Sequence, residues 1–484
     1  MTPPRPPRAP RPQRHARPHP SAPVSARDVA HQRLREEAHR YPDLGLEPLD
    51  TSAIQGQGAG REAALAHAIH DAVMRRWITL EAILAPLSSR PMRELDSTIR
   101  AALLAGAAQL LLLDRIPPHA AIHEAVQWTR KAGKPNATGL VNAVLRRVSE
   151  GIARDDQGRP VMIDGPATGH VGKADRLPLA DGRAIQLTRT ALPTDTTGWL
   201  EGATGNPRWL VERWIARHGE AAAIEQALHT LTQAPVVLNT AHATAEVVAP
   251  PGQSLEPHER AGHVVLRPQG ASPREILQGR GDLWVQDAAS ASALDLVREL
   301  EPRPQTIVDL CAGLGTKTRQ LRALFHEATV YACDTNEARA RGLRRVFQKD
   351  ERTHVLAFKE VCRAARGRAD LVLLDVPCSN SGVLPRRPEA RYRLGPEQLD
   401  RLAALQRELL LQGKALLAPG GRVLYSTCSI DKEENQDIAT WAREAAGIEV
   451  LAEAATMPAG LPGEPARCYR DGGYAALLAV PMAE

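Results

Sequence analysis

Residues 307–318 read Ile-Val-Asp-Leu-Cys-Ala-Gly-Leu-Gly-Thr-Lys-Thr, and this stretch decides the fold. A short apolar run leads into a glycine turn and then into residues suited to a helix start, which predicts strand, turn and helix. Glycines let the backbone turn tightly and approach a ligand closely. The next predicted strand, 329–333, is followed by Asp334, whose carboxylate suits the hydroxyls of a ribose. The stretch therefore predicts a nucleotide-binding α/β sheet.

The glycine turn by itself does not identify the ligand. A dinucleotide fingerprint is disfavoured because position 318 is Thr rather than a third glycine, and the spacing of a P-loop is also missing. Without further motifs, an ordinary turn between strand and helix would explain the stretch equally well.

Two further segments each place a cysteine just beyond an apolar strand. Residues 373–382 read Leu-Leu-Asp-Val-Pro-Cys-Ser-Asn-Ser-Gly, and residues 424–430 read Leu-Tyr-Ser-Thr-Cys-Ser-Ile. Ligands bind beyond the carboxyl ends of strands in open α/β sheets. We therefore expect Cys378 and Cys428 to face the crevice beside the glycine turn, with Asp375 next to them, which indicates thiol chemistry.

The pattern of apolar residues divides the chain into parts. Residues 26–152 have helical spacing and predict an all-α bundle, and residues 205–284 alternate short strand-like runs with loops, as in a small α+β linker domain. From 285 to 484, strand and helix patterns alternate, which predicts an α/β, Rossmann-like, doubly wound parallel sheet. Periodicity fades over residues 153–204, which we interpret as an insertion or linker.

Composition limits the class of protein. The chain has 484 residues and a formal charge of +5, and its first 20 residues hold five arginines, eight prolines and no acid. Residues 1–25 have little apolar surface to bury, so we expect a disordered basic tail. It would either attract nucleic acid phosphates or simply aid solubility, and the sequence leaves both open.

Membrane, secretory and metal-binding classes are disfavoured. The longest nearly apolar run, 101–113, is well short of the roughly 20 residues that a membrane helix needs. No secretory signal follows the N-terminus, so we expect a cytoplasmic protein. None of the six cysteines forms a C-x-x-C pair, and we expect neither a metal site nor disulfides.

The three motifs, in this order, resemble the RsmB/Sun (Fmu) family of RNA 5-methylcytosine methyltransferases. The glycine turn is similar to the family's D-x-C-A-x-P-G-G-K-T loop, Asp375–Ser379 to its D-A-P-C-S motif, and Ser426–Ser429 to its T-C-S motif. Residues 113–126 and 139–147 resemble the NusB-like RNA-binding domain that the RsmB branch carries ahead of its methyltransferase domain. The tail and residues 153–204 have no counterpart in this resemblance.

The resemblance implies a role for each site residue. Cys428 would be the nucleophile, Cys378 would help to release the product, and Asp375 would contact the base and the cofactor. The residues expected to bind the cofactor, S-adenosyl-L-methionine, are Cys311, Ala312, Gly313, Leu314, Gly315, Thr316, Lys317, Asp334, Glu360 and Asp375. Glu360 stands in for an acid of the family that contacts adenine. Arg386 and Arg387 would bind RNA phosphates, or else lie in a solvated loop.

The implied activity is methyl transfer to C5 of a cytosine in small-subunit (16S) ribosomal RNA, through a covalent adduct between a cysteine and C6. Ribosomal RNA would be the partner, and we expect a monomer. A transfer RNA methyltransferase is one alternative. A non-catalytic RNA-binding assembly factor is another, since Leu314-Gly315-Thr316-Lys317 departs from the family's Pro-Gly-Gly-Lys.

Overall fold

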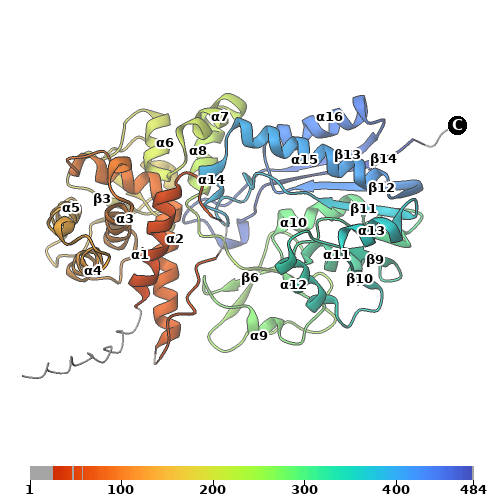
Figure 1. Cartoon of the computed structure of the whole chain (residues 1–484), viewed down its shortest axis with the longest axis horizontal. Helices are drawn as coiled ribbons and strands as arrows, with labels where there is room; N and C mark the ends of the chain where they lie inside the picture. The colour runs from red at the N-terminus through yellow and green to blue at the C-terminus, as the bar shows by residue number, and fades with distance from the viewer. Residues whose placement is uncertain (1–24, 46–47, 57, 482–484) are drawn as a thin grey trace, which may run out of the picture.

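The computed structural model describes residues 25–45, 48–56 and 58–481. A helical bundle lies at one end of the molecule and a large sheet with its helices at the other, with smaller segments packed between them (Figure 1). The predicted fold class is confirmed. The predicted basic tail lies outside the described residues, except for Ser25, which caps the first helix.

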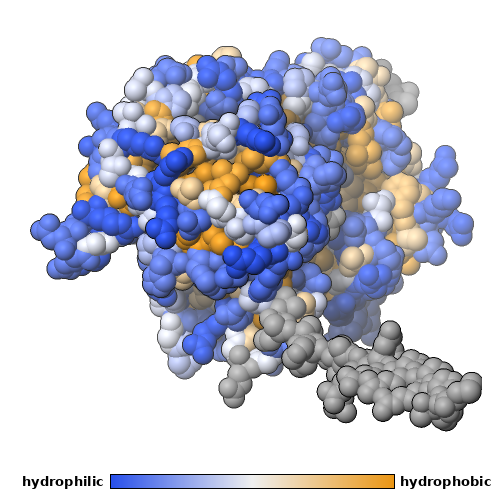
Figure 2. Space-filling view, turned by 60° about the vertical axis from the view of Figure 1, so that its left-hand side comes forward, coloured by the Kyte–Doolittle hydropathy of each residue, from blue (hydrophilic) through white to orange (hydrophobic). Residues whose placement is uncertain are grey.

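The N-terminal bundle is arranged around one central helix. Its helices are α1 (Ala26–Arg40), α2 (Ala59–Leu84), α3 (Ser97–Leu112), α4 (Pro118–Lys131) and α5 (Thr138–Glu150). α3 begins at an Asp96 cap and is buried on nearly every side from Ala101 to Gln109, so the other helices pack around it. Figure 2 brings this end forward and shows hydrophobic residues reaching its surface among hydrophilic ones.

The range predicted as an insertion or linker is folded. Strands β1 (Met162–Ile163), β2 (Arg176–Pro178) and β3 (Ala184–Gln186) form an antiparallel sheet in the order β1-β3-β2. Leu177 and Ile185 of this sheet are buried in the core of the helical bundle. The segment therefore extends the bundle's core.

The middle part combines a helical cluster with a second small sheet. Its helices are α6 (Thr196–Thr204), α7 (Arg208–His218), α8 (Glu220–His229) and α9 (Arg274–Leu277), and its sheet has the order β5 (Ser254–Pro257), β6 (His263–Arg267), β4 (Val237–Asn239), β7 (Trp284–Val285). Asn206 lies just before α7 but does not cap it. Its side chain is buried and donates to the hydroxyls of Thr204 and Thr230, while Pro207 occupies the cap position.

The C-terminal sheet carries the predicted strands. The predicted strands are β8, β9, β11 and β12, and the full order across the sheet is β10 (Thr353–Val355), β9 (Thr329–Ala332), β8 (Thr306–Asp309), β11 (Ala369–Asp375), β12 (Leu417–Thr427), β14 (Gly473–Ala479) and β13 (Glu449–Thr456). The strands from β10 to β12 are parallel, whereas β14 pairs antiparallel with both β12 and β13. The expectation of a wholly parallel sheet is therefore corrected at this edge.

Helices cover both faces of the C-terminal sheet. Val372 and Leu374 of β11 pack with α13 (Phe358–Ala365), α15 (Pro396–Lys414) and α16 (Gln436–Ala445), and Leu371 and Leu373 pack with the 3-10 turn Ala293–Val297 and α11 (Thr316–Leu324). This alternation follows from the two-residue period of a strand. The remaining helices are α10 (Ala288–Ser292), α12 (Glu337–Phe347) and α14 (Ala390–Arg393). No helix among the described residues is long and apolar enough to cross a membrane.

Candidate active site

A cavity of about 890 Å³ lies beyond the carboxyl ends of the parallel strands. It unites motifs that are more than 100 residues apart, since β8, β9, β11 and β12 all end at this edge of the sheet. The predicted site residues that line it are Cys311, Ala312, Gly313, Leu314, Thr316, Lys317, Asp334, Asp375, Cys378, Arg386, Arg387 and Cys428. Gly315 and Glu360 do not line it.

The two glycines of the turn have different roles. Gly313 has φ 57° and Gly315 has φ 88°, a backbone region that favours glycine. A Cβ on Gly315 would lie 2.7 Å from Leu343 and 2.9 Å from Phe347, so this glycine makes room for α12. A Cβ on Gly313 would meet nothing within 4 Å, which leaves its backbone accessible from the cavity.

Asp334 secures the glycine loop from the end of β9. Its Oδ2 accepts a hydrogen bond of 3.0 Å from the Gly313 N–H, and its Oδ1 accepts one of 2.8 Å from Asn336. Each carboxylate oxygen retains a further lone pair for a hydroxyl donor. This open glycine turn beside a carboxylate fits the ribose and methionine parts of S-adenosylmethionine.

Glu360 is not placed to contact a cofactor. Its side chain is exposed, and its Oε2 accepts the Ala357 N–H at 3.0 Å, which caps the start of α13. Glu360 therefore lies outside the cavity in which the sequence expected it to contact adenine. Phe358 from the same turn lines the cavity instead. Sequence reasoning looked for an acid at this point and overlooked an aromatic ring that suits a flat base.

Asp375 ends β11 and is held by two donors. Lys317 Nζ lies 2.8 Å from its Oδ1, and the Ser426 hydroxyl donates to the same oxygen at 2.9 Å. Burial alone would lower the pKa of Lys317, but the charge of Asp375, its hydrogen bond to the lysine and the nearby Cys428 and Asp309 together raise it. The lysine therefore stays charged and fixes the carboxylate at the cavity wall.

Asp309, at the end of β8, is fully buried behind this pair. The Thr318 hydroxyl donates to its Oδ2 at 2.6 Å. Burial raises the pKa of Asp309 to about 7, and the charge of Asp375 adds to the rise. The sequence placed Asp309 in the decisive stretch but gave it no role.

The two cysteine sulfurs meet inside the cavity. Cys378 Sγ and Cys428 Sγ are 3.0 Å apart, and Cys428 Sγ also lies 3.3 Å from Asn380 Oδ1. The hydrogen bond to Cys428, together with burial, raises the pKa of Cys378 well above its ordinary value. Cys378 therefore holds its proton more firmly than a free thiol does.

Asn380 is a site residue that sequence reasoning did not single out. Its φ is 62°, an uncommon value for a residue other than glycine, and its side chain donates to the Cys378 carbonyl at 3.1 Å. Asparagine tolerates this left-handed conformation. An Asn two residues after a cysteine was the available signal.

Arg386 has buried partners that the sequence did not predict. Its guanidinium pairs with Asp471 at 2.6 Å and Asp287 at 3.1 Å, and it donates to the Pro235 carbonyl at 3.1 Å. These contacts occupy the group that was expected to bind phosphate, so Arg386 braces the cavity wall. Arg387 is different, since its side chain is about half exposed and lies 3.9 Å from Glu389. It stays a candidate for phosphate binding.

The part of the chain that the structure describes contains no candidate metal site. There, no group of three or more His, Cys, Asp or Glu side chains is arranged to hold an ion. The cavity holds two thiols, a lysine–aspartate pair and a nucleotide-like loop.

Comparisons with known proteins agree with this arrangement. A family model described as 16S rRNA methyltransferase RsmB/F matches residues 297–459, and the NusB family model matches residues 26–150. Ribosomal RNA small subunit methyltransferase B of Vibrio cholerae is 30% identical over 439 residues, covering 88% of this chain and 91% of that protein. The protein of the same name from Xanthomonas campestris is 31% identical over 402 residues, covering 80% of each.

A solved structure shows the same fold over nearly the whole chain. The crystal structure of PH0851 has a TM-score of 0.65 and 22% sequence identity, and the match covers 93% of this chain and 98% of that one. The predicted family is thus confirmed by the sequence comparisons, and the solved structure shows the fold. Since a 30% identical relative spans most of its length and both family models match in order, the chain belongs to the ribosomal RNA small subunit methyltransferase B family, with a NusB domain ahead of an S-adenosylmethionine-dependent methyltransferase domain.

Proposed function

We propose that this protein methylates C5 of a cytosine in small-subunit ribosomal RNA through a covalent adduct with Cys428. The observation that carries the proposal is the meeting of the two cysteine sulfurs, 3.0 Å apart, in the cavity that also holds the glycine loop and Asp375. Two thiols at neighbouring strand ends beside a nucleotide-like site suit this reaction.

Cysteine suits the first step because C5 of cytosine is a poor nucleophile. The Cys428 thiolate would add to C6 and form a C–S bond, which moves electron density onto C5. Cysteine is strongly nucleophilic even when only a few per cent is ionised. Asp375, held by Lys317 and Ser426, is the group that would hydrogen-bond the polar edge of the base.

The cofactor site would supply the methyl group. The backbone of Gly313 and the carboxylate of Asp334 would hold S-adenosylmethionine, and Phe358 would contact its adenine. When bound, the cofactor supplies an electrophilic sulfonium methyl. The enzyme's contribution is to hold the cytosine and that methyl group in line and to exclude water.

Release of the product requires loss of the C5 proton. The C5 proton would pass to a base or to solvent, and the electron pair of the C5–H bond would re-form the C5–C6 double bond while the C6–S bond breaks, which returns Cys428 as a thiolate. The family resemblance gives Cys378 the task of assisting this release. Its sulfur lies within direct reach of Cys428.

The NusB domain would bring the RNA to the site. The names of the relatives specify ribosomal RNA of the small subunit, and this substrate is preferred over transfer RNA because a NusB domain is present here. Arg387 at the cavity rim would bind a phosphate of the strand that enters.

Bisulfite mapping of small-subunit RNA tests the proposal. Cells that lack the gene should lose protection at one cytosine, and the wild-type gene should restore it. A matched map of transfer RNA decides the alternative substrate. Unchanged small-subunit RNA together with a lost transfer RNA signal would overturn the ribosomal assignment, and no change in either would overturn cytosine methylation altogether.

A further inference from the structure

We propose that Arg213 and Arg217 of α7 are positioning residues that hold the nucleophile loop, residues 427–435, against the Cys378 loop, residues 377–382. The proposal rests on the proposed function, since it concerns the geometry of the proposed nucleophile. Both arginines belong to the middle part of the chain, more than 200 residues before the nucleophile loop. They touch neither cysteine.

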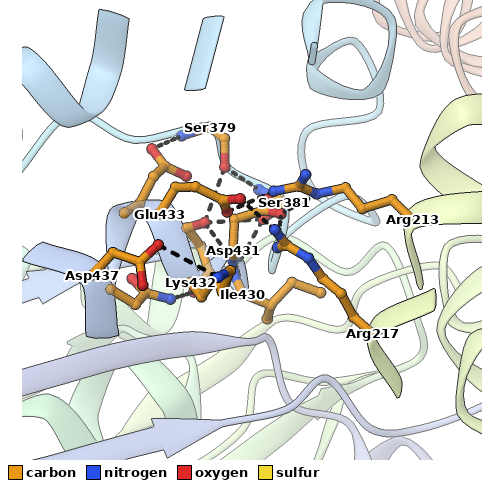
Figure 3. Close-up of polar contacts among 12 residues, drawn as sticks. Arg213, Arg217, Ser379, Ser381, Ile430, Asp431, Lys432, Glu433 and Asp437 are labelled. Atoms are coloured by element: carbon orange, nitrogen blue, oxygen red, sulfur yellow. Dashed lines mark hydrogen bonds and ion pairs between the residues drawn. The ribbon is translucent and has the colours of Figure 1, made fainter. Parts of the chain in front are cut away.

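The two arginines form a double fork on two acids of the nucleophile loop (Figure 3). Arg213 lies 2.9 Å from Asp431 and 2.6 Å from Glu433, and Arg217 lies 3.1 Å from Asp431 and also pairs with Glu433. They stand four positions apart on α7, which puts them on one face of the helix. Such forked, charge-assisted contacts fix direction as well as distance.

Asp431 connects the two arginines to Ser429, the residue that follows the proposed nucleophile. Its backbone N–H donates to the Ser429 hydroxyl at 3.0 Å, and Ser429 directly follows Cys428. The Ser429 hydroxyl also lies 3.1 Å from the hydroxyls of Ser379 and Ser381. Ser379 directly follows Cys378, so one buried cluster of serine hydroxyls ties the two cysteine loops together (Figure 3).

Glu434, near the end of the nucleophile loop, makes a second connection between the nucleophile loop and the Cys378 loop. Its Oε1 accepts the Ser379 N–H at 2.9 Å and the Gln406 amide at 3.0 Å. The Ile430 N–H donates to the Ser381 hydroxyl at 3.0 Å. The nucleophile loop and the Cys378 loop therefore share one continuous, buried network of hydrogen bonds.

The arginines are needed because the loop concentrates negative charge. Asp431, Glu433 and Glu434 lie within four positions, and both Asp431 and Glu434 are buried. Without the arginines, Asp431 would be a buried charge without a counter-ion beside two other acids, which is strongly unfavourable. The loop would shift to expose these acids and would carry Ser429 and Cys428 with it. A displacement of about 1 Å can cost about 100-fold in rate.

The first test reads the distance between the thiols without RNA or cofactor. Diamide oxidises the two thiols to a disulfide and is itself reduced to the hydrazine, so the rate of the Cys378–Cys428 cross-link reports how well the sulfurs are positioned. The double variant R213Q/R217Q should cross-link about tenfold more slowly than wild type. The control R208Q changes an exposed arginine of the same helix, which pairs with Glu212, and should cross-link at the wild-type rate.

The second test separates a loss of thiol positioning from a general loss of folding or of cofactor binding. In the double variant, kcat should fall by about 10-fold to 100-fold while KM for S-adenosylmethionine changes less than about twofold, since the glycine loop lies outside the network. R213K/R217K keeps the charge without the fork and should recover part of the kcat.

Wild-type cross-linking and wild-type kcat in R213Q/R217Q would overturn the proposal. Equal losses in kcat and in affinity for the cofactor, in step with loss of folded protein, would also overturn it. If wild-type protein transfers no methyl group to cytosine, the proposed function fails, and the diamide test still decides whether the arginines position the two thiols.

Discussion

Cys378 and Cys428, 50 residues apart in the chain, have their sulfur atoms 3.0 Å apart at the ends of β11 and β12. The register of the two strands explains this meeting, because Asp375 of β11 pairs with Ser426 of β12. After this pair, the segment that follows each strand reaches its cysteine, at the wall of the same cavity, within three residues. The sheet thus brings the two cysteine loops to the same edge.

This proximity predicts reversible inactivation by peroxide. Hydrogen peroxide should oxidise both thiols to a Cys378–Cys428 disulfide, with two molecules of water as the other product, and dithiothreitol should restore methyl transfer. Peptide mapping without reductant checks the cross-link. Cys378→Ala should form no such disulfide, and a wild-type enzyme that keeps full activity while the disulfide forms would contradict the assigned role of Cys428.

The two cysteines should fail in different ways when replaced. Cys428→Ala removes the nucleophile and should abolish turnover while S-adenosylmethionine binding, measured by calorimetry, stays within about twofold. Cys378→Ala should leave attack possible but slow release, so protein–RNA adducts that survive denaturing gels should accumulate. Adducts in the Cys428 variant, or none in the Cys378 variant, would reverse the assignments.

Phe358 rather than Glu360 should govern cofactor affinity. Phe358→Ala removes an aromatic wall of the cavity and should weaken S-adenosylmethionine binding about tenfold, in keeping with the roughly 0.5–1.5 kcal/mol of an aromatic contact plus lost burial. Glu360→Gln is the matched control, since its amide oxygen can still accept the Ala357 N–H. Calorimetry measures both, and a larger loss in the Glu360 variant would refute the corrected assignment.

The neighbouring arginines should separate stability from RNA binding. Arg386→Gln leaves Asp287 and Asp471 buried without their counter-ion and should cost about 3 kcal/mol or more in the free energy of unfolding. Arg387→Gln should change stability by less than about 0.5 kcal/mol. It should instead weaken RNA binding and reduce the slope of the logarithm of the binding constant against the logarithm of the salt concentration by about one. Chemical unfolding and RNA titrations at two salt concentrations distinguish these effects.

Asp309 should make stability depend on pH. Burial raises its pKa to about 7 in the folded state, whereas an unfolded aspartate titrates near 3.9. The folded state therefore binds the extra proton in this window, so the free energy of unfolding should fall as pH rises from about 4 to about 7. Asp309→Asn removes that fall. As pH rises across the window, the free energy of unfolding of this variant should therefore gain a few kcal/mol relative to that of wild type.

Urea unfolding at both ends of the pH window measures this effect. The matched control is Asp400→Asn, which changes an exposed aspartate of α15 and should keep the wild-type pH dependence. An Asp309→Asn variant whose stability follows the wild-type curve at every pH would show that Asp309 keeps its charge inside the protein.

The sequence by itself determined the features that depend on neighbours along the chain. The apolar run, glycine turn and helix start at 307–318 specify a strand–turn–helix unit, and β8 and α11 lie where this pattern predicted them. Cysteines placed just after two apolar strands could be assigned to one edge of the sheet, because parallel strands end together. Local periodicity and turn chemistry carry this information, so the fold class and the meeting of these motifs at one cavity were predictable.

Only the tertiary structure decided which partner each polar group has. Arg386 and Arg387 are adjacent, yet one is held by Asp287 and Asp471 from distant segments and the other is half exposed. The cap made by Glu360, the antiparallel edge strand β14 and the arginines of α7 also depend on contacts between segments far apart in sequence. The free energy of a buried charge is set by what surrounds it in space, and sequence spacing does not encode those neighbours.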